Sequence, residues 1–188
     1  MSDKTNTNKA NENEPFFSKR EIVEWVITVA VAICFAVIIN TFVLVNAKIP
    51  SGSMENTVMT GDRIFGTRLS YKNAEPERGD IVIFKYPDDE SQLFIKRVIG
   101  LPGETLEVKS GLVYINGSEA PLDEPYVKEE PLGDYGSVLI PEGAYFMMGD
   151  NRNNSRDSRF WINHFVYKDK ILGKAWMRYY PRPGKIEN

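Results

Sequence analysis

The sequence predicts a mostly β fold, an antiparallel β-sheet or coiled β-barrel, preceded by one N-terminal transmembrane helix. Residues 22–45 form a long apolar stretch that contains neither Gly nor Pro. After it come short apolar or alternating runs that are typical of strands, with turn dipeptides between them. No stretch after residue 45 repeats its apolar residues with the period of a long helix. We therefore expect a single long helix followed by one β-rich domain.

The apolar stretch is long enough to span a membrane. As a helix rising 1.5 Å per residue, residues 22–45 extend roughly 36 Å, whereas the hydrocarbon core of a bilayer is about 30 Å thick. A cleaved secretory signal is the alternative, because Val45-Asn46-Ala47 resembles a small-residue cleavage site. The apolar part of such a signal usually has about 7 to 15 residues. The length therefore favours a permanent anchor.

The distribution of basic residues predicts the orientation of this anchor. Lysines and arginines that precede the apolar stretch outnumber those just after it: Lys4, Lys9, Lys19 and Arg20 come before, Lys48 and Arg63 after. This bias favours an amino terminus inside the cell. The first 15 residues are polar apart from Met1, Ala10 and Pro15, so they cannot offset the entropy of ordering. The predicted parts are a disordered cytoplasmic tail at 1–18, a transmembrane anchor at 19–46 and an extracytoplasmic domain at 47–188.

Within that domain, the predicted strands are short and separated by turns. The runs lie at residues 80–86, 93–99, 105–108, 112–115, 143–148 and 171–180. Ser110-Gly111 and Asn116-Gly117 are dipeptides of the kind that close tight hairpins. Residues 118–137 are rich in Pro and acidic side chains, and we expect them to form an excursion on the surface.

The composition excludes several classes of function. The net charge is -3, and no Lys/Arg run with interleaved aromatics provides a footprint for nucleic acid. Cys34, the only cysteine, lies in the apolar stretch, and His164 is the only histidine. A disulfide framework and a metal site of several Cys or His ligands are therefore ruled out. We expect no metal, no cofactor and no nucleic-acid partner.

The first segment with candidate chemistry is IPSGSM at residues 49–54, a few residues after the apolar stretch. Ser53 follows a glycine. A nucleophilic serine benefits from such a neighbour, because a substrate carbonyl and backbone N–H groups must approach its oxygen closely. A polar turn that merely follows the helix is the alternative.

The second segment is QLFIKRVIG at residues 92–100, a predicted strand with two charges in its middle. With period two, Lys96 shares a face with Phe94 and Val98, so its amine has no evident wet side. Burial disfavours the charged form and lowers the pKa of an amine from its usual value of about 10.4. A lysine that is neutral near physiological pH can act as a general base. An edge strand protected by Lys and Arg is the alternative.

The third segment, MGDNRNNSRDSR at residues 148–159, is a polar loop after an apolar strand. Alternating Asp and Arg suit a network in which guanidinium groups hold carboxylates and fix the loop. A calcium loop fits poorly, because Arg152 would occupy the third ligand position and neither the required Gly nor the terminal Glu follows. A Ser-His-Asp triad through His164 is a further alternative, but its surroundings do not resemble a nucleophile elbow. A structural histidine is the default.

Together, these motifs resemble type I signal peptidase. The order is Ser-Gly-Ser-Met after the membrane stretch, then Gly61-Asp62, then KRVIGLPG at 96–103 and GDNRxxSxDSR at 149–159. The compact size and single anchor resemble the short form typical of Gram-positive bacteria. The resemblance implies a single-pass protein of the cytoplasmic membrane with an external catalytic domain. Its implied partners are membrane lipid and the signal peptides of secreted preproteins, cut after a small-x-small motif.

The resemblance also implies roles for individual residues. Ser53 would be the nucleophile and Lys96 the general base, so histidine is not required. The Ser51 hydroxyl and the Ser53 backbone N–H would form the oxyanion hole, and Ser155 would orient the Lys96 amine. The remaining implied roles are a structural polar network and shallow apolar pockets for small substrate side chains: the network comprises Asp157, Arg159 and Arg97, and the pockets comprise Ile49, Val58 and Ile95.

Two rival functions remain open. A Ser-Lys self-cleaving switch of the repressor-processing type would share the catalytic pair, but no helix-turn-helix pattern precedes Ser53. A catalytically inactive module could bind extended peptides by strand addition. The presence of both Ser53 and Lys96 argues against such a module.

Overall fold

The computed structural model describes residues 18–187, so the predicted tail lies outside the described residues except for Ser18. The first element is the helix α1, Lys19–Phe42, which is long and apolar enough to cross a membrane. A capping box begins it. The Ser18 N–H donates to the Glu21 carboxylate at 2.7 Å, and the Glu21 N–H donates to the Ser18 hydroxyl at 3.2 Å. The single apolar helix predicted from the sequence is confirmed.

This helix ends earlier than the predicted anchor, which extended to Asn46. Residues Leu44–Lys48 form strand β1 and pair antiparallel with β2, Arg63–Thr67. The apolar stretch therefore continues past Phe42 because Val45 enters the core of the β unit, where it is 3% exposed. By its internal contacts the chain divides into two compact units after Ile39, and every strand belongs to the second unit.

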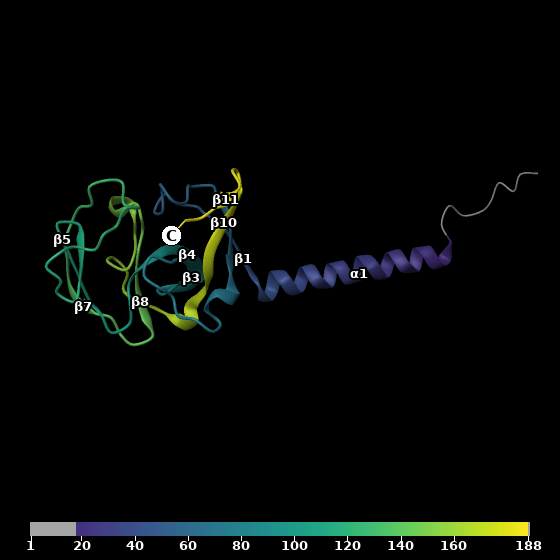
Figure 1. Cartoon of the computed structure of the whole chain (residues 1–188), viewed down its shortest axis with the longest axis horizontal. Helices are drawn as coiled ribbons and strands as arrows, with labels where there is room; N and C mark the ends of the chain where they lie inside the picture. The colour runs from purple at the N-terminus through teal and green to yellow at the C-terminus, as the bar shows by residue number, and fades with distance from the viewer. Residues whose placement is uncertain (1–17, 188) are drawn as a thin grey trace, which may run out of the picture. The chain divides into compact units, whose positions relative to one another are not determined.

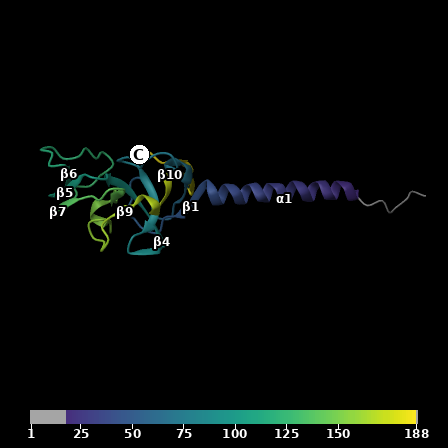
Figure 2. The same ribbon diagram turned by 90° about the horizontal axis from the view of Figure 1, so that it is seen from below.

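Two antiparallel sheets build the second unit (Figure 1). The larger has the strand order β1-β2-β10-β3-β4-β8-β9, with β11 paired to β10. Its further strands are β3 Ile81–Tyr86, β4 Asp89–Gly100, β8 Ala144–Met148, β9 Val166–Tyr167, β10 Ile171–Tyr180 and β11 Gly184–Lys185. The smaller sheet has the order β6-β5-β7, from Leu112–Ile115, Thr105–Lys109 and Tyr135–Leu139. Within this unit, both views place β5 and β7 at the end opposite to β1 and β10 (Figure 2).

The mostly antiparallel β fold confirms the predicted class, and each predicted run contains a strand. Five further strands are not apparent in the sequence: β1, β2, β7, β9 and β11. Strand β7 includes residues 135–137, which were expected to belong to the surface excursion. It is mostly exposed or half-buried and has only β5 as a neighbour, so no strong apolar pattern indicates it.

The two turn dipeptides have different outcomes. Ser110 and Gly111 both have positive φ, 49° and 80°, and join β5 to β6 as a tight hairpin. Asn116 and Gly117 also have positive φ, but they follow β6, whose only partner in the sheet is β5. This second turn therefore ends a strand without closing a hairpin.

Three apolar clusters support the sheets, and one of them lies beneath the Ser53 segment. This cluster joins Ile49, Met54 and Val58 to the inward side chains of β2, β3 and β4, including Ile64, Ile83 and Ile95. A second cluster fills the space between β8 and the three-stranded sheet, with Phe146 and Leu106 as members. The Ser53 segment is therefore packed onto the sheet through its own apolar side chains.

Candidate active site

Ser53 sits in a tight turn that its neighbours fix on both sides. Met54 is fully buried in the core, and Val58 N–H donates to the Met54 carbonyl at 2.8 Å. Upstream, the Ile49 N–H donates to the Asp62 carbonyl at 2.9 Å. Ser53 itself is 6% exposed. A buried apolar residue directly after the serine therefore sets where its hydroxyl lies.

Lys96 reaches this hydroxyl from strand β4. Its Nζ lies 2.6 Å from Ser53 Oγ and 3.1 Å from the Ile95 carbonyl oxygen, and the side chain is 4% exposed. Burial lowers the pKa of Lys96 from 10.5 to about 8, although the negative charges of Asp157 and Asp150 oppose the shift. The amine therefore has an accessible neutral form at mildly basic pH.

Two further serines border the pair. The Ser51 hydroxyl lies 3.5 Å from Ser53 Oγ. The Ser155 hydroxyl is buried and has no hydrogen-bond partner among the described residues. A methyl group on Gly149 would come within 2.3 Å of both Ser155 Oγ and the Ser53 carbonyl oxygen. The missing side chain at Gly149 thus allows the Ser155 and Ser53 segments to meet.

Buried ion pairs fix the loop that carries Ser155. Arg97 of β4 donates two hydrogen bonds to Asp150, at 2.8 and 2.7 Å, and both side chains are at most 1% exposed. Asp157 accepts from the Arg159 guanidinium at 2.9 Å and from the Gly149 N–H at 3.1 Å. The predicted network residues therefore form two separate pairs. Sequence reasoning did not identify Asp150, although it belongs to the motif at 149–159.

Asn151 is a second contact residue that sequence reasoning did not assign. Its backbone N–H donates to the Ser53 carbonyl at 3.1 Å, and its side-chain amide donates to the Gly52 carbonyl at 3.1 Å. The loop after β8 therefore holds the serine turn through main-chain oxygens. The position of Asn151 between Asp150 and Arg152, within the motif at 149–159, is the sequence feature that could have identified it.

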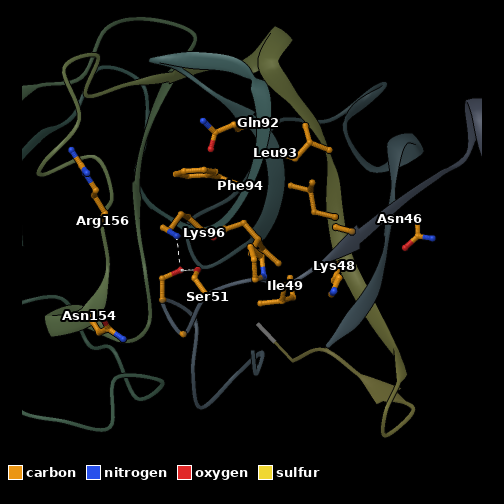
Figure 3. Close-up of a pocket in the computed structure, with 16 residues that line it drawn as sticks. Asn46, Lys48, Ile49, Ser51, Gln92, Leu93, Phe94, Lys96, Asn154 and Arg156 are labelled. Atoms are coloured by element: carbon orange, nitrogen blue, oxygen red, sulfur yellow. Dashed lines mark hydrogen bonds between the residues drawn. The ribbon is translucent and has the colours of Figure 1, made fainter. Parts of the chain in front are cut away.

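A cavity of about 460 Å³ opens beside the Ser53–Lys96 pair (Figure 3). It is bounded by β1 and the residues that follow it, by the first half of β4, and by the loop after β8. The lining residues are Asn46, Ala47, Lys48, Ile49, Pro50, Ser51, Gly52, Ser53, Ile83, Gln92, Leu93, Phe94, Ile95, Lys96, Asn154 and Arg156.

Of the three predicted pocket residues, Ile49 and Ile95 line this cavity and Val58 does not. Val58 is 1% exposed and packs in the core cluster, because the turn that starts at Met54 directs it inward. His164 does not line the cavity either. Its Nδ1 lies 2.7 Å from the Ser158 carbonyl oxygen, and its ring contacts Tyr135. This histidine is therefore part of the packing of the second sheet.

Within residues 18–187, no group of three or more His, Cys, Asp and Glu side chains is arranged to hold a metal ion. The polar groups at the cavity are hydroxyls, amide side chains, backbone groups, the buried Lys96 amine and two further basic side chains.

Known proteins resemble this chain over most of its length. Residues 22–180 match the family described as signal peptidase, peptidase S26. The chain is 41% identical over 182 residues to a probable signal peptidase I-2 of Synechocystis sp., which covers 94% of this chain and 80% of that protein. It is 34% identical over 191 residues to a signal peptidase I of Bacillus licheniformis, with 96% of each chain covered. A crystal structure of a signal peptidase I from Enterococcus faecalis V583 has a TM-score of 0.47 at 35% identity, covering 54% of this chain and 97% of that chain.

These sequence matches define a serine peptidase, a hydrolase of peptide bonds. The chain belongs to the signal peptidase family, peptidase S26, whose activity is the removal of signal peptides from preproteins. Its described part has one N-terminal apolar helix long enough to cross a membrane, which is consistent with a single-pass membrane protein of this family.

Proposed function

We propose that this chain cleaves preproteins with Ser53 as the nucleophile and Lys96 as the general base. The observation that carries the proposal is the 2.6 Å contact between Lys96 Nζ and Ser53 Oγ, made by an amine whose pKa burial lowers to about 8. A neutral amine at hydrogen-bond distance from a hydroxyl can accept its proton as the oxygen attacks. A histidine base is not needed.

The proposed reaction has two halves. Neutral Lys96 takes the Ser53 proton while Ser53 Oγ forms a bond to the scissile carbonyl carbon. The resulting ammonium gives this proton to the leaving amine as the C–N bond breaks, which leaves an acyl-enzyme on Ser53. A water molecule then loses a proton to Lys96 and attacks the ester, and Lys96 returns this proton to Ser53 Oγ as the acyl C–O bond breaks, which releases the signal peptide with a free carboxyl group and restores the enzyme.

The oxyanion of each tetrahedral intermediate needs donors close to Ser53. The Ser53 backbone N–H forms no hydrogen bond with another residue of 18–187, so it is available to an incoming oxyanion. The Ser51 hydroxyl, 3.5 Å from Ser53 Oγ, is the second candidate donor. We assign Ser155 the role of orienting the Lys96 amine during the reaction, because its buried hydroxyl has no hydrogen-bond partner among residues 18–187 and is therefore free to bond the amine.

The substrate would bind as an extended strand, because the cavity has unpaired strand edges. Strand β1 is the terminal strand of the large sheet, and β4 pairs with β8 only from Arg97 onward. The earlier part of β4 therefore has hydrogen-bonding groups free on its cavity side, which favours strand addition. The apolar walls near Ile49 and Ile95 suit the small side chains of a small-x-small motif.

The helix α1 would hold the amino terminus inside the cell and the β unit outside, at the outer face of the cytoplasmic membrane. Supporting this orientation are the basic residues that precede the apolar stretch. A protease and a preprotein in one bilayer meet at a high effective concentration. Membrane lipid is accordingly a partner of α1.

Purified full-length protein and a preprotein provide the test. We expect Ser53→Ala and Lys96→Ala each to lower kcat by at least about 10³, because both groups act on the same proton. His164→Ala should keep most of the activity, because His164 lies outside the cavity. Loss of cleavage in the His164 variant alone, or tight peptide binding without cleavage by the parent protein, would contradict the proposal.

Ser155→Ala separates orientation from folding. We expect kcat to fall about 10- to 100-fold, since one hydrogen bond to the base is worth about 1 to 3 kcal/mol. The free energy of unfolding should stay unchanged or rise, because the substitution removes a buried hydroxyl that lacks a partner. A cooperative loss of structure would show that Ser155 is needed for the fold.

A further inference from the structure

The catalytic cavity has an unusual charge balance. Its lining includes three basic side chains, Lys48, Lys96 and Arg156, and no Asp or Glu. Lys96 is buried and, in the proposed mechanism, neutral when it acts as a base. Lys48 and Arg156 are exposed, so they carry the cavity's permanent positive charge.

Arg156 differs from the other arginines of its loop. Arg152 forms a buried ion pair with Glu124, and Arg159 forms one with Asp157. The Arg156 guanidinium forms no hydrogen bond or ion pair with any residue between 18 and 187. Only its backbone carbonyl is engaged, by the Trp161 ring N–H at 3.1 Å. The side chain is therefore available to a bound ligand, while its backbone is fixed.

The position of Arg156 indicates which part of a substrate it meets. Figure 3 shows Arg156 and Asn154 on one side of Lys96, with Ile49 and Lys48 on the opposite side. The side with Ile49 is the apolar one, and under the proposed function it receives the small residues before the cleaved bond. An extended peptide that passes Ser53 then continues toward Arg156 with the residues that follow the bond.

We propose that Arg156 is a specificity-determining residue that favours preproteins with an acidic side chain among the first three residues after the cleaved bond. The inference rests on the proposed function, because it uses the direction in which the substrate lies. A guanidinium attracts a carboxylate and repels an ammonium, and at an exposed site such a contact changes affinity only modestly. The contact acts on substrate binding and leaves the proton transfers of Ser53 and Lys96 unchanged.

The test uses full-length protein in detergent and a set of peptides that share one small-x-small motif. At each of the first three positions after the bond, one peptide carries Asp, one Asn and one Lys. We expect kcat/KM of the parent protein to follow Asp > Asn > Lys, with an Asp-to-Lys ratio of about 2 to 10 at one position or more. High salt should reduce this ratio, because the contact is exposed.

Arg156→Gln should bring the Asp-to-Lys ratio close to one, and Arg156→Glu should invert it. Lys48→Gln is the matched control. It removes an equally exposed cation from the opposite side of the cavity and should leave the ratio unchanged. A parent ratio of one, or a ratio that survives Arg156→Gln, would overturn the assignment while peptide cleavage continues. An equal loss of kcat/KM on the Asp, Asn and Lys peptides in the Arg156→Gln variant would also overturn the assignment. Absence of cleavage by the parent protein would instead overturn the proposed function, and the inference with it.

Discussion

If Lys96 is the base, as proposed, the burial of its amine sets the pH range of cleavage. With a pKa of about 8, the fraction of neutral amine rises about tenfold per pH unit below pH 8 and levels off above it. We expect kcat/KM to follow this curve. The measurement is the pH profile of cleavage, with Lys48→Gln as a control that should keep the same inflection. An inflection near 10.5, the ordinary value for lysine, would contradict a buried base.

The same burial costs stability, and the sign of its pH dependence follows from linkage. Between pH 8 and 10.5 the unfolded lysine is protonated while the folded one is neutral, so this group makes stability rise with pH. At pH 7 we expect Lys96→Met to raise the free energy of unfolding by up to about 3 kcal/mol, the cost of lowering the pKa from 10.5 to about 8. Chemical denaturation in detergent should show that the stability difference between Lys96→Met and the parent protein becomes smaller toward pH 10.5. An equal gain at pH 7 and pH 10.5 would contradict this account.

The absence of a side chain at Gly149 lets the Ser53 and Ser155 segments meet. Gly149→Ala places a methyl group 2.3 Å from the Ser53 carbonyl oxygen, a backbone atom that cannot move aside cheaply. We expect kcat to fall at least about 100-fold, since displacement of reacting groups by about 1 Å has effects of that size. Gly136→Ala is the control, because a Cβ there meets nothing within 4 Å. Activity assays of both variants should separate them clearly.

Local chemistry made the serine and the lysine candidates, through a small neighbour for one and an apolar face for the other, and the family resemblance gave them their roles. Sequence reasoning could not pair Arg97 with Asp150, which lies 53 residues away and shares no pattern with it. The resemblance also implied a pocket role for Val58, whereas the turn after Met54 directs that side chain into the core. Tertiary direction of a side chain is not encoded in spacing.

The buried Arg97–Asp150 ion pair connects strand β4 to the loop that follows β8. We expect Asp150→Ala to lower the free energy of unfolding by about 3–5 kcal/mol, because it leaves a guanidinium buried and unpaired. Glu107→Ala is the matched control, since it breaks the exposed pair of Glu107 with Lys109 and should cost less than about 1 kcal/mol. Denaturation curves for both variants test the difference. An equal loss of unfolding free energy in the two variants would mean that the buried pair does not stabilise the contact between β4 and this loop.

The strands that sequence patterns predicted are those with a strong apolar run or clear alternation. Strands β3, β4 and β8 have long buried stretches, and all were expected. Strands β9 and β11 have two residues each, too few to form a pattern, and β1 continues the apolar stretch of the helix without a break. Periodicity therefore identifies buried strands, while short and edge strands depend on their partners.

At the scale of the whole molecule, the anchor and the β unit are separable parts. We expect a chain that begins at Asn40 to fold and to cleave short peptides within about tenfold of the full protein. Its rate of cleavage of preproteins in vesicles should fall about 10- to 100-fold, because a shared bilayer no longer concentrates the two proteins. A chain that begins at Ile49 is the control, since it lacks β1, the partner of β2. Equal vesicle activity of the Asn40 chain and the full protein would contradict the role of the anchor.

The strand order of the large sheet also has a consequence for biosynthesis. Strands β1 and β2 flank the Ser53 turn, β3 and β4 present Lys96, and β10 lies between the two pairs as their shared neighbour. A ribosome completes Ser53 and Lys96 well before it reaches Ile171, so the emerging polypeptide carries both reactive groups on hairpins that are not yet joined. The two hairpins can therefore be joined through β10 only after Ile171–Tyr180 has been synthesised, well after the Ser53 and Lys96 segments have left the ribosome.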